Sequence, residues 1–230
     1  LFCLDFNAVS RLEILSDTIE ANTTARRVLI DHHLSPDGHF DLSFSYPDSS
    51  STCFLVYSII EALFGTDAIT RQMAEALYVG IMTDTGNFAY SFLTPELFRA
   101  VAVLVGTGIS IPDIHNNVYN AYTEGRARLF GYAINRKMEI IQDGTVAYMS
   151  LLENEMRRFQ FQQGDSEGFV NYALTVKKMK MSAMFLAHRK FIRVSLRSRG
   201  DVDVNLFARK YFNGCLLYTS PSPRDPKTSR

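Results

Sequence analysis

The stretch "RRVLIDHHLSPDG", residues 26–38, decides how the first part of the chain folds. Its apolar centre, Val28–Ile30, is short, rich in β-branched residues and followed by polar residues and a turn-forming SPDG segment. This pattern predicts a buried strand that runs into a loop. Asp31, His32 and His33 are then expected at the carboxyl end of a strand, where ligands and catalytic groups collect in open parallel sheets. A loop that is merely polar is the alternative.

A second unit of the same kind opens the chain. The segment "LFCLD", residues 1–5, places four apolar residues before Asp5. A helical pattern around Leu15 and Ile19 separates the two units, and a strand, a helix and a second strand in this order favour a parallel pair. We therefore expect Asp5 and the Asp31–His33 tripeptide at the same edge of one sheet.

Helices are predicted over the next part of the chain. The segments "DSSSTCFLVYSIIEALFG" (48–65) and "TRQMAEALYVGIMTDTG" (70–86) each begin with Ser or Thr cap candidates and end in glycine. The second of these helices places Asp84 at its carboxyl end. A third helix is expected over 94–105, with Pro95 at its first position.

The sequence pattern changes after a helical stretch over 126–138, which is expected to act as a connector. The segments "MEIIQDGTVAYMSL" (138–151) and "MSAMFLAHRKFIRVSLRSRG" (181–200) alternate apolar and polar residues around a turn, which predicts two hairpins. Asp201 is expected to cap a final helix over 202–212. These elements indicate a second domain of the α+β type.

Composition and charge limit the function classes. Residues 1–122 carry a net charge of −9 and residues 171–214 one of +8, which suits a metal-binding part and a phosphate-binding part. The alternative is that two solvated faces of opposite sign merely attract each other. The three cysteines form no CxxC spacing, which favours a reducing cytosol, and the apolar run over 100–105 is too short to span a bilayer. A cytoplasmic protein without a membrane role is expected.

Asp5, His32 and Asp84 come from three separate strand or helix ends, which is how dispersed metal sites are built. Carboxylate and imidazole ligands without thiolate favour Mn²⁺, with Mg²⁺, Co²⁺ or iron as alternatives. Each residue also has a simpler interpretation: Asp5 as a loop acid, and Asp84 as a helix-end residue bonded to a backbone amide.

The segments "LDFNAVSRL", "IDHH", "SSSTCFLVYSII", "GIMTDTGNF" and "VSLRSRGDVDVNLFARKYFNG", in this order, resemble the DHH/DHHA1 phosphoesterases, most closely the bacterial oligoribonuclease and pAp phosphatase group. The resemblance implies an α/β fold: a parallel-sheet DHH domain with flanking helices over 1–122 and a smaller α+β DHHA1 domain over 139–214. A helical linker over 123–138 would join them. The implied activity is hydrolysis of short oligoribonucleotides and of adenosine 3′,5′-bisphosphate.

The resemblance also implies a role for each site residue. Two divalent metal ions, usually manganese, would be bridged by Asp5 and completed by His32 and Asp84. His33 would contact the scissile phosphate, and Asp31 would orient a neighbouring imidazole. In the second domain Arg197 and Ser198 would contact the substrate, a short RNA or a nucleotide. A surface arginine at a strand end is the alternative for Arg197.

Other activities stay open at this point. Cleavage of cyclic dinucleotides and single-strand exonuclease activity belong to the same family, and a nucleotide-binding module without catalysis belongs to another class. A homodimer is a further expectation. The family's first motif is absent before Asp5, and its glycine-rich loop with a histidine is replaced after Gly214 by residues 215–230, which resemble translated sequencing-adapter sequence. We expect the parent protein to be an enzyme and these 230 residues alone not to be a competent one.

Overall fold

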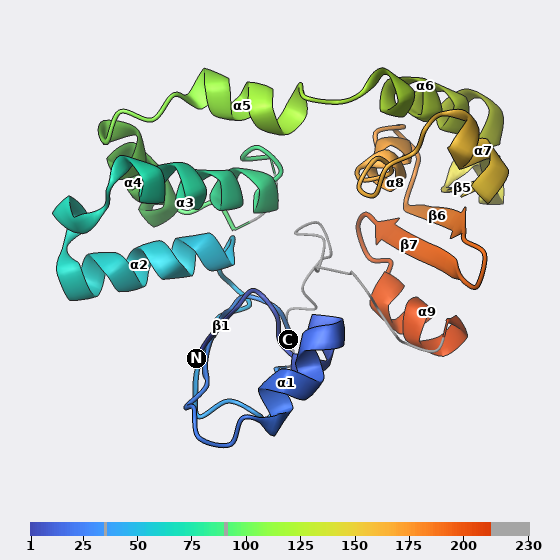
Figure 1. Ribbon diagram of the computed structural model, residues 1–230. Helices are drawn as coiled ribbons and strands as arrows, with labels where there is room; N and C mark the ends of the chain where they lie inside the picture. Colours follow the sequence, from blue (N-terminus) through green and yellow to red (C-terminus); the bar gives the residue numbers. More distant parts are fainter. Residues whose placement is uncertain (35, 90–91, 213–230) are drawn as a thin grey trace. The chain divides into compact units, whose positions relative to one another are not determined.

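The computed structural model describes residues 1–34, 36–89 and 92–212. Its contacts divide the chain into two compact units, Leu1–Val118 and Tyr119–Arg230 (Figure 1). The segment 215–230, expected to be a non-native tail, lies outside the described residues. The chain is a mixed α/β protein with a parallel sheet and flanking helices, as the sequence predicts.

The first unit contains a three-stranded parallel sheet in the order β1-β2-β3. Its strands are β1 (Phe2–Leu4), β2 (Val28–Asp31) and β3 (Leu42–Ser45), with Leu4 paired to Ile30 and Asp31 paired to Ser45. A 3-10 helix (Val9–Leu15) and α1 (Ser16–Ala21) connect β1 to β2. The predicted parallel pair is therefore confirmed, and β3 is an addition that the sequence analysis did not anticipate.

Helices follow the sheet, and Figure 1 shows α2 and α3 side by side. These α-helices are α2 (Thr52–Phe64), α3 (Arg71–Asp84), α4 (Pro95–Gly106) and α5 (Ile111–Tyr119). A short 3-10 helix, Thr66–Ala68, follows α2. Helices α2, α3 and α4 are capped at their N-termini by Ser51, Thr70 and Thr94. In each case the side-chain oxygen accepts a hydrogen bond from the backbone N–H three residues later. These three helices, with Asp84 at the end of α3 and Pro95 opening α4, match the prediction.

The second unit is built around a four-stranded sheet in the order β4-β5-β6-β7. Its elements are α6 (Glu124–Tyr132), a π-helical turn (Ala133–Lys137), β4 (Met138–Ile141), a 3-10 turn (Gln142–Gly144), β5 (Val146–Leu151), α7 (Glu153–Arg158), α8 (Phe169–Ala173), β6 (Met181–Ala187), β7 (Ile192–Ser198) and α9 (Val204–Tyr211). Both predicted hairpins are present, since β4–β5 and β6–β7 are antiparallel. A parallel β5–β6 pair joins them.

Two details of the second unit differ from the sequence analysis. The stretch expected to be a connector contributes to the unit's core, where Leu129 and Ala133 are completely buried. The cap of α9 is Asp203 instead of Asp201, because Asp203 Oδ1 accepts a hydrogen bond from the Leu206 N–H at 3.1 Å. Asp203 lies directly before the first helical residue, which is where a cap can reach the free N–H groups.

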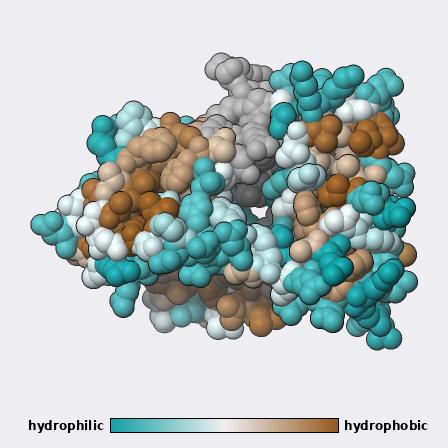
Figure 2. All heavy atoms as spheres, turned by 90° about the horizontal axis from the view of Figure 1, so that it is seen from above, coloured by the Kyte–Doolittle hydropathy of each residue, from teal (hydrophilic) through white to brown (hydrophobic). Residues whose placement is uncertain are grey.

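The surface carries both polar and apolar side chains. Figure 2 shows apolar patches set among hydrophilic residues on the face that it displays, and Phe2, Ile14 and Phe64 are among the exposed apolar residues. Among the described residues no single helix is long and apolar enough to span a membrane; the bent pair Pro95–Gly106 and Ile111–Tyr119 passes by length and composition only.

Helices α2 and α3 approach each other closely at Gly80. An ideal Cβ at Gly80 would lie 2.1 Å from Cys53 Sγ and 2.8 Å from Cys53 Cβ, both closer than real contacts allow. We expect Gly80→Ala to lower the free energy of unfolding by about 1–3 kcal/mol through overpacking.

The matched control is Gly106→Ala, also in a helix of the first unit, where an added Cβ meets nothing within 4 Å. We expect this change to be neutral or slightly stabilising. Urea denaturation followed by circular dichroism measures both variants, and equal stability of the two would contradict the proposed close packing.

Candidate metal centre

Asp5 lies directly after β1, at the carboxyl edge of the parallel sheet. Its backbone N–H donates to the Ile30 carbonyl at 3.1 Å, which holds it against the end of β2. Its φ of 65° is in the left-handed region, which is unfavourable for a residue with a side chain. Backbone strain of this kind is often concentrated at functional sites, so it supports a special role for the Asp5 carboxylate.

His33 is held by a buried carboxylate. Its Nδ1 lies 2.6 Å from Asp31 Oδ1, and Asp31 is fully buried. Because the ionised carboxylate can only accept, Nδ1–H donates, and in the neutral ring Nε2 keeps its lone pair. The second oxygen, Asp31 Oδ2, has no hydrogen-bond partner among the described residues. The contact places Asp31 against the His33 ring, and the orienting role that the resemblance implies for Asp31 stays a prediction.

His32 faces two carboxylates. Its Nε2 lies 3.7 Å from Asp5 Oδ1 and 3.7 Å from Asp84 Oδ2, while its Nδ1 is 3.3 Å from the Ser49 carbonyl oxygen. That carbonyl can only accept, so Nδ1 carries the proton and Nε2 points its lone pair toward the carboxylates. Burial, and then the neighbouring His33, lower the pKa of His32. The ring is therefore neutral near pH 7 and able to bind a cation.

Asp84 reaches the same place from the last residue of α3. Burial raises the pKa of its carboxyl to about 7, and the negative charge of Asp5 adds to the effect. Two carboxylates and two imidazoles thus meet at this place. In the described part of the chain, no Lys or Arg side chain lies within ion-pair distance of either carboxylate, and only a protonated histidine could supply a positive charge. A bound cation would relieve this repulsion.

The donor set fits a divalent metal ion. One ligand atom each from Asp5, His32 and His33 lies within 4.8 Å of the others. Burial raises the pKa of the Cys53 thiol to about 11, with smaller effects from the charges of Asp84 and Asp5, so this nearby sulfur stays protonated. Oxygen and imidazole ligands without thiolate suit manganese, magnesium or a similar ion. His33 lies beside this group, and its assignment to the scissile phosphate stays a prediction.

The sequence analysis missed two residues that hold the site together. The Thr52 hydroxyl donates to Asp5 Oδ1 at 2.8 Å, and the Ser49 carbonyl holds His32. Both belong to the serine-rich turn that starts α2, which we interpreted only as a source of helix caps. No local signal in the sequence marked either contact, because hydroxyl residues are expected where a helix begins and Ser49 acts through its backbone carbonyl.

Arg197 and Ser198 lie on β7 in the second unit. The Arg197 guanidinium donates to the Leu196 carbonyl at 2.8 Å, and its side chain is partly exposed. Ser198 is fully buried, and its hydroxyl donates to the Val202 carbonyl at 2.6 Å. This bond gives Ser198 a structural role at the start of the turn toward α9. The substrate contacts of both residues stay predictions.

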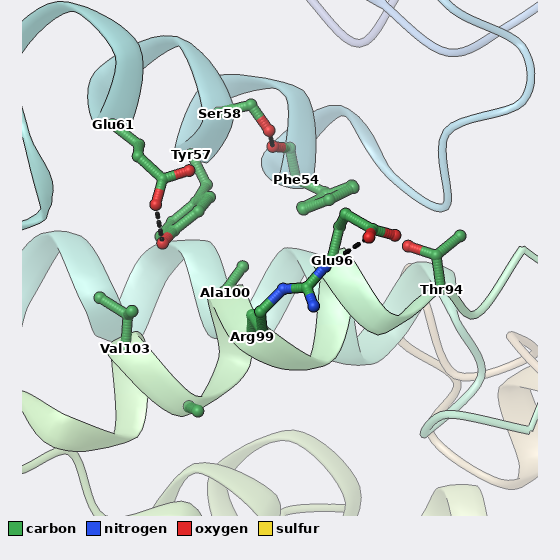
Figure 3. Close-up of a pocket in the computed structure, with 10 residues that line it drawn as sticks. Phe54, Tyr57, Ser58, Glu61, Thr94, Glu96, Arg99, Ala100 and Val103 are labelled. Atoms are coloured by element: carbon green, nitrogen blue, oxygen red, sulfur yellow. Dashed lines mark hydrogen bonds and ion pairs between the residues drawn. The ribbon is translucent and has the colours of Figure 1, made fainter.

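A groove of about 680 Å³ lies elsewhere in the first unit, between α2 and α4 (Figure 3). Its polar groups are already paired: Tyr57 donates to Glu61 at 3.0 Å, and Glu96 bonds Arg99. None of the clustered aspartates and histidines lines it. The carboxylates and imidazoles converge at the sheet edge, so we place the chemistry there and not in this groove.

Comparisons with known proteins agree with this geometry. Residues 1–81 match the DHH family, N-terminal domain. The chain is 28% identical over 188 residues to the bifunctional oligoribonuclease and PAP phosphatase NrnA of Thermus thermophilus, covering 80% of this chain and 54% of that protein. It is 25% identical over 191 residues to the Bacillus subtilis protein of the same name, covering 83% and 60%.

A crystal structure of an exopolyphosphatase-related protein from Bacteroides fragilis has a TM-score of 0.86 and 39% identity, covering 92% of this chain and 62% of that one. The chain thus spans between 54% and 62% of the length of these three relatives. The family match ends at residue 81, just before Asp84.

The raised pKa of Asp84 predicts how stability depends on pH without metal. Folding raises this pKa from 3.8 to about 7, so the contribution of Asp84 to stability falls as the pH rises between these values, and the full cost is present above pH 7. We expect metal-free Asp84→Asn to be about 2 kcal/mol more stable than the parent at pH 8, allowing for partial exposure. The gain should vanish near pH 4. Denaturation in EDTA measures it, and a variant that is less stable at pH 8 would contradict the assignment.

The Thr52 hydrogen bond predicts a change in metal affinity. We expect Thr52→Val to weaken Mn²⁺ binding about tenfold, because the Asp5 carboxylate loses the donor that orients it. Thr52→Ser keeps the hydroxyl and is the matched control. Calorimetric titration of the 230-residue chain with Mn²⁺ gives both affinities. Val and Ser variants with equal affinity would show that the bond does not orient the ligand.

Proposed function

Because the chain belongs to the DHH family, we propose that the protein is a metal-dependent phosphoesterase that hydrolyses short oligoribonucleotides and adenosine 3′,5′-bisphosphate. The observation that supports this most is the clustering of Asp5, His32, His33 and Asp84 at the carboxyl edge of the sheet. Two of the relatives are named for these two substrates. The name of the third, an exopolyphosphatase-related protein, also denotes phosphate chemistry.

The proposed metal ligands are Asp5, His32 and Asp84, and His33 lies beside them as the proposed contact for the scissile phosphate. When bound, divalent cations lower the pKa of water and neutralise charge that develops on phosphoryl oxygens. Manganese is the proposed ion, with Mg²⁺ or Co²⁺ as alternatives, and two ions are proposed, which Asp5 would help to hold.

The protein's own residues prepare the site for such a substrate. Asp31 holds a proton on His33 Nδ1 and stabilises the ring if Nε2 also becomes protonated. In that state His33 is a hydrogen-bond donor suited to a phosphate oxygen, as the sequence analysis proposed. Thr52 and the Ser49 carbonyl fix Asp5 and His32 before any ligand arrives, so little reorganisation is needed on binding.

The second unit is proposed to be a DHHA1 domain that binds the nucleotide. Arg197 is the proposed contact for a substrate phosphate, since its planar guanidinium matches phosphate oxygens; Ser198 supports that end of β7. Short RNA or nucleotides are the proposed partners, and a homodimer and a cytoplasmic location stay predictions. Among the described residues of the first unit, no feature favours cyclic dinucleotides or long single strands over these substrates.

The test is release of phosphate from adenosine 3′,5′-bisphosphate and of mononucleotides from a dinucleotide. The 230-residue chain is assayed alone and as a fusion carrying the segments of the B. fragilis relative that lie outside the matched region. We expect Mn²⁺-dependent turnover by the fusion, with a loss of at least about a hundredfold on Asp84→Asn, because a metal clamp fails when a ligand is removed. Turnover that survives EDTA would overturn the proposal.

A further inference from the structure

The turn between β6 and β7, residues 188–192 and here called the hairpin tip, presents an aromatic ring to solvent. The His188 N–H donates to the Phe191 carbonyl at 2.8 Å, which closes a tight turn. The rings of His188 and Phe191 stack with centroids 4.6 Å apart and planes inclined by 27°. Phe191 nevertheless remains 60% exposed and Ile192 63% exposed. The fold supports the ring from one side and leaves the other side open.

The hairpin tip is also strongly basic. Residues 187–199 contain five Lys or Arg and no Asp or Glu. Arg189 and Lys190, next to the exposed ring, are themselves exposed, and neither pairs with a carboxylate among the described residues. Two cations beside an open aromatic face are the combination with which proteins bind single-stranded nucleic acids.

The basic character continues from the tip along β7. Arg193 and Arg197 are four residues apart, so they project from the same face of the strand. Among the described strands, β7 ends the order β4-β5-β6-β7. Arg197 is five residue steps beyond Ile192, which at about 3.3 Å per step is roughly 17 Å. One mononucleotide is too short to reach from Arg197 to the hairpin tip, whereas a short oligonucleotide can span them.

We propose that the hairpin tip is a binding site for a single-stranded oligonucleotide, with a base stacked on Phe191 and phosphates bound by Arg189 and Lys190. The inference rests on the proposed function, which places a nucleotide at Arg197, and it deepens that function. It separates the two substrate classes: oligonucleotides use the tip and adenosine bisphosphate does not.

A tryptophan probe tests the stacking directly, because the chain contains no tryptophan. Phe191→Trp places the sole indole at the tip, and we expect its fluorescence to be quenched by a five-nucleotide oligoadenylate in EDTA, where no turnover occurs. Phe64→Trp, at a position 69% exposed on α2, is the control and should not respond. Quenching of Phe191→Trp by heparin, a polyanion without bases, to the same extent would overturn base stacking, as would no quenching by the oligonucleotide.

Charge variants test the phosphate contacts. We expect Arg189→Ala with Lys190→Ala to weaken binding of the labelled oligonucleotide at least about fivefold and to lower the salt dependence by about 1.4 in log–log slope, for two phosphates. The control removes the same charge from Lys177 and Lys178, which precede β6 and so lie at the opposite end of that strand from the tip. Equal losses in the two double variants would show general attraction and overturn the site.

Substrate length separates this inference from the proposed function. In the fusion assay we expect the Arg189/Lys190 double variant to raise KM for the oligonucleotide and to leave KM for adenosine bisphosphate within about twofold. If the double variant leaves KM unchanged for both substrates, the hairpin tip is not an oligonucleotide site, and the proposed function is unaffected. Absence of metal-dependent hydrolysis in the parent fusion would overturn the proposed function, while the binding measurements in EDTA would still decide the tip.

Discussion

The parallel pairing of β1 with β2 is the constraint on which the site depends. Leu4 pairs with Ile30, so the next residue of each strand, Asp5 and Asp31, emerges at the same edge of the sheet. The hydrogen bond from the Asp5 N–H to the Ile30 carbonyl continues this pairing by one residue. Asp5 makes this bond with a backbone φ of 65°, in the left-handed region. A shift of one residue in register would turn every side chain of β1 to the other face and separate the two carboxylates.

The electrostatics of the edge follow from that register. The sheet brings Asp5 close to both histidines and Asp31 against His33, and α3 adds Asp84 beside His32. Two of these groups are tuned by burial in opposite senses: the pKa of Asp84 is raised and that of His32 is lowered. Both shifts reduce charge in a site without a cation. A bound cation would favour the ionised form of Asp84 beside a neutral His32, which is the coupling between metal binding and pKa expected of a metal centre.

Much of this could be predicted from local patterns. The position of Asp5 at a strand end could be predicted because an acid follows an apolar run. The position of Asp84 at a helix end could be predicted from the periodicity of the preceding residues. Both signals depend on residues that are close in sequence. The Thr52 bond to Asp5 joins residues 47 apart, and no local pattern distinguishes a hydroxyl that caps a helix from one that orients a carboxylate. The parallel β5–β6 pair was missed for a related reason, since two hairpins predict antiparallel partners and leave the contact between hairpins undetermined. The cap of α9 at Asp203 differs from the predicted one by two residues, which is within the usual uncertainty of helix ends.

Paramagnetic NMR of the histidine side chains tests the metal centre most directly. The chain has five histidines, so His39, His115 and His188 act as internal references for the two in the site. In ¹⁵N spectra near pH 7, metal-free His32 should show a neutral ring protonated at Nδ1, next to His33, the second ring of the site. With substoichiometric Mn²⁺ the signals of these two rings should broaden first while the other three stay sharp. Equal broadening of all five rings, or loss of the His39 signal first, would contradict a metal site at the edge of the sheet.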